Sequence, residues 1–374
     1  MFGRSWRIGT IRGIPVSVDS SWVWIAVLIT YTLWAQFDAL YAGVGTGTAL
    51  ALAVFAAALF FASVFLHELA HAVAARLHHI PVFGITLVFF GGFTSAKSDA
   101  KGPGPAFVIS AVGPGTSAVL GVLFWRLSLL FAATNRPLAA AFGYLGWVNG
   151  FMAAFNVIPG LPLDGGRMLE AVVWRVTGNR DRSTQIAAYA GMGVGVLLAA
   201  IGLGLAAGLY DIANFHEFGG LWFAIIGVFI FQGARGSERQ IALRRTLAGA
   251  TVADAMDPPP PSVPADMALS EVLERYLRGH EGEAFPVVEG ANRVIGMISM
   301  GSARPIGQHD PLRPARDALI PLSQVVVTQM DEPLDEAAAG LGTRRAALVL
   351  RDGQLVGAIT GEAVARWAAR AHPV

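Results

Sequence analysis

The stretch His67-Glu68-Leu69-Ala70-His71 lies near the end of an almost uncharged apolar run that extends from about Thr46 to Ala75. On a helix, residues at positions i and i+4 share one face, so His67 and His71 can offer imidazole nitrogens to a single zinc ion. Glu68 stands beside them as a candidate general base. Three such polar groups could instead satisfy one another inside a helix bundle. Ionisable groups at hydrocarbon depth are costly and usually functional, which favours a metal site in a membrane helix.

The composition indicates a membrane protein. Hydrophobic residues make up 54% of the 374-residue chain and charged residues 14%, against about 25% charged residues in soluble domains. The formal net charge is +1, and no basic cluster with interleaved aromatic residues is present, so nucleic acid is not an expected partner. The chain has no cysteine, which excludes disulfides and thiolate ligands. A bound metal would therefore be held by imidazole and carboxylate groups.

Six apolar spans are expected to cross the membrane. They are placed at Trp22–Gln36, Thr46–Leu77, Pro105–Ala132, Pro137–Val157, Thr184–Tyr210 and Gly220–Gln232. The first 12 residues lack the apolar core and cleavage site of a signal peptide, so the first span should remain in the mature protein. Arginine and lysine concentrate before the first span and after the second, fourth and sixth, which predicts a multi-pass protein with both termini in the cytoplasm.

A third zinc ligand is needed, because a catalytic zinc site usually has three protein ligands and one open position. Asp164 is the best candidate, in the segment Asn156-Val157-Ile158-Pro159-Gly160-Leu161-Pro162-Leu163-Asp164-Gly165-Gly166-Arg167. The second and fourth spans run in the same direction, which places Asp164 at the membrane depth of the two histidines. Taken alone, such a segment is more often a loop capped by an aspartate. Its coincidence with the histidine motif favours a ligand.

Together these two segments resemble the site-2 protease family of intramembrane zinc metalloproteases, in particular its sporulation-factor-processing subgroup. That family has His-Glu-x-x-His on one helix and Asn-x-x-Pro-x-x-Pro-x-Asp-Gly-Gly on another, and both match here. The resemblance covers roughly residues 1–245. It implies one zinc ion per chain, bound by His67, His71 and Asp164, with Glu68 as base and acid. It further implies that Asn156 lies near the substrate carbonyl.

The same resemblance implies a class of substrate. Members of the family cut single-span membrane proteins, including anti-sigma-type and other signalling proteins, after another protease has trimmed them. Residues Ile80–Ala96 are rich in β-branched and aromatic residues and contain the pair Gly91-Gly92, which predicts a membrane-associated hairpin or edge strand. In the family such a strand is thought to pair with an extended substrate segment, although a purely structural hairpin fits the residues equally well. Gly113-Pro114-Gly115-Thr116-Ser117 resembles a family motif whose expected role is close helix packing.

Two alternatives to a protease remain. A membrane transporter or channel would need ionisable groups spread over several helices, and these are scarce outside the His and Asp cluster. A pseudoprotease would bind membrane segments without cutting them, and the intact Glu68 argues against it. For Asn156, a hydrogen bond that only packs helices is as compatible with the sequence as oxyanion stabilisation.

After Arg245 the long apolar runs stop, and residues 246–374 predict a soluble cytoplasmic α+β module. Its two comparable halves, about 251–305 and 312–372, each have a helix-like stretch followed by two strands, and together they resemble a tandem CBS pair. Such pairs bind adenine nucleotides in many proteins, commonly through an aspartate that is replaced here by Ser302 and Ala363. An adenine nucleotide is therefore the weaker expectation, and a homodimer formed through the pair is the alternative. The whole chain is predicted to be a polytopic α-helical protease of the plasma membrane, followed by this module.

Overall fold

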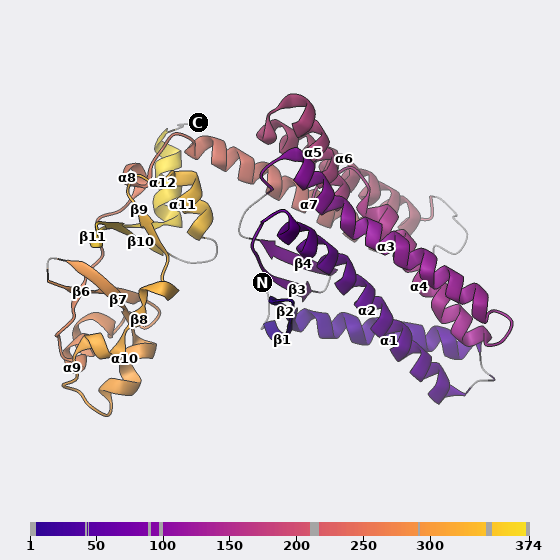
Figure 1. Cartoon of the computed structure of the whole chain (residues 1–374), viewed down its shortest axis with the longest axis horizontal. Coiled ribbons are helices and arrows are strands. Elements are labelled where there is room, and N and C mark those ends of the chain that lie inside the picture. Colours follow the sequence, from indigo (N-terminus) through magenta and orange to yellow (C-terminus); the bar gives the residue numbers. More distant parts are fainter. Residues whose placement is uncertain are drawn as a thin grey trace. The chain divides into compact units, whose positions relative to one another are not determined.

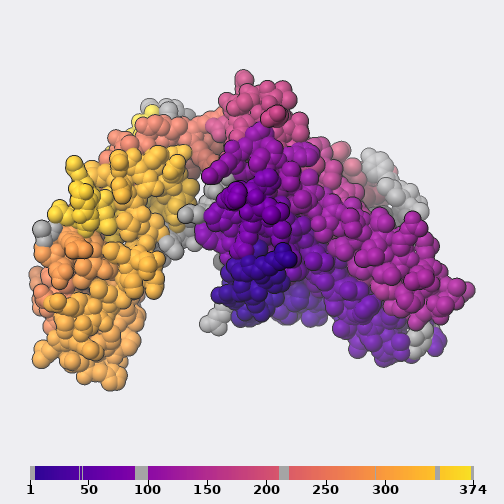
Figure 2. Space-filling model, in the orientation of Figure 1, coloured from indigo at the N-terminus to yellow at the C-terminus, as the bar shows by residue number. Residues whose placement is uncertain are grey.

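A computed structural model of the chain divides into two compact units, Met1–Ile241 and Ala242–Val374 (Figure 1). It describes residues 5–41, 43, 45–88, 91–96, 100–209, 217–290, 292–341 and 346–371. Residues 89 and 90 of the predicted hairpin Ile80–Ala96 and residue 210 of the predicted span Thr184–Tyr210 fall outside the described residues. In the space-filling view, the second unit is the continuous orange and yellow body (Figure 2).

Six helices within the described residues are long and apolar enough to cross a membrane, which confirms the predicted polytopic helical fold. They are α1 (Ser20–Leu40), α2 (Thr46–Leu77), α3 (Pro103–Phe131), α4 (Arg136–Asn156), α6 (Arg180–Ala206) and α7 (Glu217–Leu247). The last span was predicted to end at Gln232, but α7 continues for 15 residues beyond it. Hydropathy marks where apolar residues stop, whereas the arginine-rich continuation still favours a helix.

A shorter helix, α5 (Asp164–Thr177), follows the fourth span and was not foreseen from the sequence. It is too polar to be a membrane span, and the prolines and glycines before it suggested only a loop. It ends at Gly178, whose backbone has φ 67° in the left-handed region that glycine adopts without strain. Asp164 is the first residue of this helix and not a residue of a loop.

Two hairpins combine into one four-stranded sheet with the order β1-β2-β3-β4. The strands are β1 (Ser5–Ile11), β2 (Ile14–Asp19), β3 (Val82–Val88) and β4 (Gly91–Ala96). Strands β2 and β3 pair in parallel, and the other two pairs are antiparallel. The sheet packs on α2 through a small core of buried residues, Ile14, Ala72, Ala75, Ile80, Val82 and Ile85. Arg76 of α2 donates to the carbonyl oxygens of Arg12 and Gly13 in the first turn, so the sheet is fixed to the end of the helix that carries both histidines.

The second unit contains a seven-stranded sheet with the order β5-β6-β7-β11-β10-β9, to which β8 adds beside β7. Its strands are β5 (Val263–Pro264), β6 (Ala284–Glu289), β7 (Arg293–Ser299), β8 (Ile320–Pro321), β9 (Val327–Gln329), β10 (Ala346–Arg351) and β11 (Gln354–Thr360). Its α-helices are α8 (Val252–Ala255), α9 (Leu269–Val272), α10 (Met300–Gly307), α11 (Leu334–Leu341) and α12 (Gly361–Ala371). Each half contributes one antiparallel hairpin, β6–β7 or β10–β11, and the buried residues form two main cores, each built mostly from one half with a few residues of the other. The predicted repeat of a helix followed by two strands is therefore confirmed.

Helices α6 and α7 approach each other so closely that glycine is required between them. A Cβ atom added to Gly202 would lie 2.3 Å from the backbone nitrogen of Ala224, and one added to Gly227 would lie 2.4 Å from that of Ala199. Small residues at helix interfaces allow such contact, and in membranes this packing replaces the hydrophobic effect as the force that holds helices together.

We predict that Gly202→Ala destabilises the first unit, because the added methyl group has no space against α7. Overpacking of this kind costs about 1–3 kcal/mol. Gly193→Ala on the same helix is the matched control, because a Cβ there meets no atom within 4 Å. Thermal unfolding in detergent should show a lower Tm for Gly202→Ala than for Gly193→Ala, and equal values would show that the helix pair is less tight than described.

Candidate metal centre

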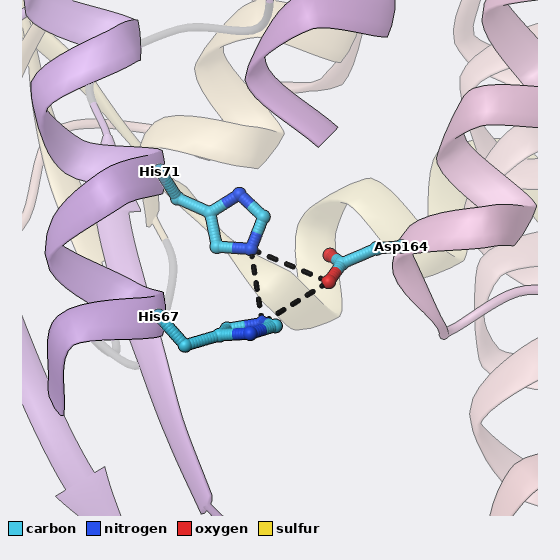
Figure 3. Close-up of side chains that lie close together, drawn as sticks. All are labelled: His67, His71 and Asp164. Atoms are coloured by element: carbon cyan, nitrogen blue, oxygen red, sulfur yellow. Dashed lines mark hydrogen bonds and ion pairs between the residues drawn. The ribbon is translucent and has the colours of Figure 1, made fainter. Parts of the chain in front are cut away.

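Three side chains converge at one point of the first unit (Figure 3). His67 and His71 lie on α2, and Asp164 begins α5. The Nε2 atom of His67 is 3.2 Å from Oδ2 of Asp164, the Nε2 atom of His71 is 3.3 Å from the same oxygen, and the two nitrogens are 3.2 Å apart. His67 is buried, and the other two residues are half-buried. The structure thus brings together the three residues that the sequence predicted as metal ligands.

The distances within this triangle fit a zinc ion. Zinc binds nitrogen and carboxylate oxygen at about 2.0–2.1 Å in tetrahedral geometry, so two neighbouring ligand atoms stand about 3.3 Å apart. The three observed separations are 3.2, 3.2 and 3.3 Å. Two imidazoles and one carboxylate are also a common ligand set of catalytic zinc, with a fourth position open to water.

Close backbone contacts place Asp164 at the triangle. A Cβ atom on Gly165 would lie 2.3 Å from the carbonyl oxygen of Val157, and one on Gly166 would lie 2.2 Å from the nitrogen of Leu161. The loop before α5 is attached in turn to α6, where Leu161 N–H donates to the Ala187 carbonyl at 3.1 Å. The two glycines of the motif are therefore needed for space, because they let the first turn of α5 fold back on the loop.

The carboxyl group of Asp164 is ionised at neutral pH, as a zinc ligand must be. Burial by itself raises its pKa, but hydrogen bonds that His67 and His71 donate when their Nε2 atoms carry a proton outweigh that effect and lower the pKa to about 2. Its position in the first turn of α5 adds the favourable field of the helix N-terminus.

Helix α3 contacts the other side of both imidazole rings. Nδ1 of His67 lies 2.9 Å from Oγ of Ser117, and Nδ1 of His71 lies 2.6 Å from the carbonyl oxygen of Ile109. The sequence placed Ser117 in a motif with a packing role and did not identify these contacts. The sequence offered one indication of these contacts, since Ile109 and Ser117 are eight residues apart and therefore lie on one face of the helix. The contact with Ile109 uses its backbone carbonyl, so the identity of residue 109 could not predict it.

The remaining predicted site residues lie as follows. Glu68 follows His67 on α2 and is half-buried. Asn156 is the last residue of α4, and its side-chain amide donates to the Met152 carbonyl at 3.0 Å. Gly91 and Gly92 begin β4, where they pair with Val88 and Leu87 of β3. Their roles in catalysis stay predictions.

Comparison with known proteins identifies the family. The model of Peptidase family M50 matches residues 55–135 and 130–200, and the CBS domain model matches residues 252–303. The protein named zinc metalloprotease Rip3 of Mycobacterium tuberculosis is 35% identical over 96% of this chain and 91% of its own length. The chain belongs to peptidase family M50, the site-2 protease family. It is accordingly a membrane-embedded zinc metalloprotease with a C-terminal CBS domain, and the transporter or channel alternative falls away.

Two further proteins are similar to this chain. The protein named zinc metalloprotease sll0528 of Synechocystis is 34% identical over 86% of this chain and 83% of its own length. The solved structure of the site-2 protease from Methanocaldococcus jannaschii is 24% identical, covers 63% of this chain and 96% of that chain, and has a TM-score of 0.42.

We predict that Gly191→Ala lowers zinc affinity without touching a ligand. A Cβ atom there would lie 2.0 Å from the carbonyl oxygen of Leu161, so the loop that leads into Asp164 must move. Displacing a group that orients a ligand typically costs about 10–100-fold in metal affinity. Competition with a chromophoric zinc chelator measures the change, with Gly193→Ala as the control. Wild-type affinity in Gly191→Ala would mean that this loop does not set the position of Asp164.

Proposed function

We propose that His67, His71 and Asp164 hold one zinc ion and that this centre hydrolyses peptide bonds of single-span membrane proteins within or next to the bilayer. The observation that supports this most directly is the triangle of ligand atoms, 3.2–3.3 Å apart, inside a bundle of apolar helices. Ionisable residues are costly at that depth, so three of them brought to one point indicate a functional centre.

The chemistry divides between the metal and Glu68. Zinc in this position would supply a water of lowered pKa and a Lewis acid for the scissile carbonyl. Glu68 accepts the proton of the attacking water and later donates it to the leaving amine. Asn156 uses its amide for the Met152 carbonyl, but a side-chain amide has two N–H donors. The second one is available for the oxygen of the substrate carbonyl.

The substrate must be extended before it is cut, because the peptide bonds of a helix are sterically hidden. Strand β4 is one of the two outer strands of the sheet order β1-β2-β3-β4, and it lies against α2. We infer that an unwound substrate segment adds beside β4 by main-chain hydrogen bonds. Gly91 and Gly92 stand at the start of this strand, where the lack of side chains permits close approach of another backbone.

The arrangement of the chain in the cell follows from charge and domain organisation. Arginine and lysine concentrate on the connections after α2, α4 and α7, which supports a plasma-membrane protein with cytoplasmic termini. We propose a protease domain over residues 1–245 and a regulatory or assembly module over residues 246–374, with a homodimer formed through the latter. Single-span signalling proteins of the anti-sigma type are the substrates that the family favours.

Glu68→Gln tests the assigned chemistry. Glutamine keeps the size of the side chain but cannot accept a proton, so hydrolysis of a single-span substrate should fall by at least about 100-fold, within the usual range for loss of an acid–base group. Zinc content should stay at the wild-type level. Cleavage in proteoliposomes, followed on gels, measures the first quantity, and metal analysis measures the second. Cleavage that persists in Glu68→Gln would remove this residue from the reaction.

Asp164→Ala tests the ligand set itself. Without the carboxylate, two neutral imidazoles remain, and zinc affinity should fall by well over the roughly 10–100-fold that loss of an outer-shell partner costs. The double variant His67→Ala, His71→Ala should lose zinc completely. His78→Ala, at the C-cap of the same helix, is the control and should keep it. Zinc per chain after purification in detergent decides the matter, since full occupancy in Asp164→Ala would require another third ligand.

A further inference from the structure

The geometry points to a positioning role for α3 at the metal centre: we propose that Ser117 and the backbone carbonyl of Ile109 hold the two histidines in the ligating orientation. This inference rests on the proposed zinc site, which it extends to a helix that contributes no ligand. Residues 109, 113 and 117 are separated by four, so they form one stripe on α3. That stripe lies against the face of α2 that carries His67 and His71.

The carbonyl of Ile109 determines which nitrogen of His71 carries the proton. A carbonyl oxygen can only accept, and Nδ1 of His71 lies 2.6 Å from it, so Nδ1 must be the protonated nitrogen. In a neutral imidazole the lone pair is then on Nε2, the atom that faces Asp164 at 3.3 Å. The helix backbone thus fixes the tautomer that can bind a metal.

Ser117 has the equivalent position for His67. Its hydroxyl lies 2.9 Å from Nδ1 of His67, and neither residue is exposed by more than 5%. When Nε2 of His67 serves as a ligand, Nδ1 keeps its proton, and Nδ1–H donates a hydrogen bond to the Ser117 oxygen. Other hydroxyls in these helices behave differently: Ser63, Ser110 and Thr116 each donate to the carbonyl four residues earlier. Within the part of the chain that the structure describes, the hydrogen-bond partner of Ser117 is His67.

Gly113 makes both contacts possible. A Cβ atom there would lie 2.1 Å from Nε2 of His71 and 2.8 Å from Nε2 of His67. A single methyl group would therefore occupy the space of the ligating nitrogens. In a helix a side chain leans toward the preceding turn, so a residue larger than glycine at position 113 would also cover the Ile109 carbonyl.

The test compares variants of the full chain purified in detergent. Ser117→Ala removes the acceptor for His67, whereas Ser110→Ala removes a buried hydroxyl of the same helix that contacts no histidine. Zinc affinity is measured by chelator competition, and Co²⁺ substitution gives a visible absorption spectrum that reports ligand geometry. We expect Ser117→Ala to lower zinc affinity by about 10–100-fold and to change the Co²⁺ spectrum. Ser110→Ala should match the wild type in both.

A second pair of variants tests the same face of α3 without changing Ser117. Gly113→Ala should abolish zinc binding, whereas Gly115→Ala should not, because a Cβ at 115 meets no atom within 4 Å. Thermal unfolding of the metal-free proteins separates positioning from packing. The proposal is overturned if Ser117→Ala binds zinc as tightly as Ser110→Ala. It is also overturned if Ser117→Ala binds zinc more weakly but its metal-free form has a lower Tm than metal-free Ser110→Ala and its Co²⁺ spectrum is unchanged, because the loss would then reflect packing.

The same measurements distinguish failure of this inference from failure of the zinc site. If Asp164→Ala loses zinc while Ser117→Ala retains it with an unchanged Co²⁺ spectrum, the centre stands and α3 has no part in it. If the wild type binds zinc no better than Asp164→Ala, the proposed centre itself is wrong.

Discussion

The candidate metal centre depends on one constraint, the convergence of an ionised carboxylate with two imidazoles in a bundle of apolar helices. A carboxylate left alone in such surroundings would be too costly to keep charged. Asp164 reduces this cost because it starts a helix outside the spanning segments, and its oxygen lies 3.2–3.3 Å from two histidine nitrogens, near enough for one cation to contact all three atoms. A bound dication would complete the compensation, since it adds positive charge where the carboxylate and the two lone pairs converge.

Backbone proximity, more than side-chain shape, sets the positions of these groups. Around the triangle, α3, α5 and α6 each approach a neighbour at a glycine, namely Gly113, Gly166 and Gly191. At each of them a Cβ atom would lie within 2.2 Å of another atom. At Gly166 and Gly191 the close neighbour is another main chain, and at Gly113 it is the imidazole of His71, so the fold leaves the ligand atoms little room to move. This suits a metal site, whose ligand distances tolerate little error.

Local spacing and membrane depth made much of this predictable from the sequence. The i and i+4 spacing of His67 and His71 needs only a helix, and the apolar runs located the six spans. Asp164 could be added because spans of the same direction end at the same side. The parallel pairing of Val16 with Ile85 could not be predicted, because the two segments are 69 residues apart and nothing in their residue types identifies them as partners. The contact of His71 with the Ile109 carbonyl could not be predicted either, because every residue has a backbone carbonyl.

In the second unit, the departure from the usual CBS pattern has a structural explanation. At position 302, where nucleotide-binding pairs commonly place an aspartate, the Ser302 hydroxyl accepts from the N–H of Ser299, and Ser299 in turn caps the first turn of α10. At position 363, Ala363 donates its N–H to the hydroxyl of Thr360 and has no polar side chain. Both helix starts are thus stabilised within the chain, and neither position offers a carboxylate to a ribose. An adenine nucleotide bound by this module would have to be held by other groups.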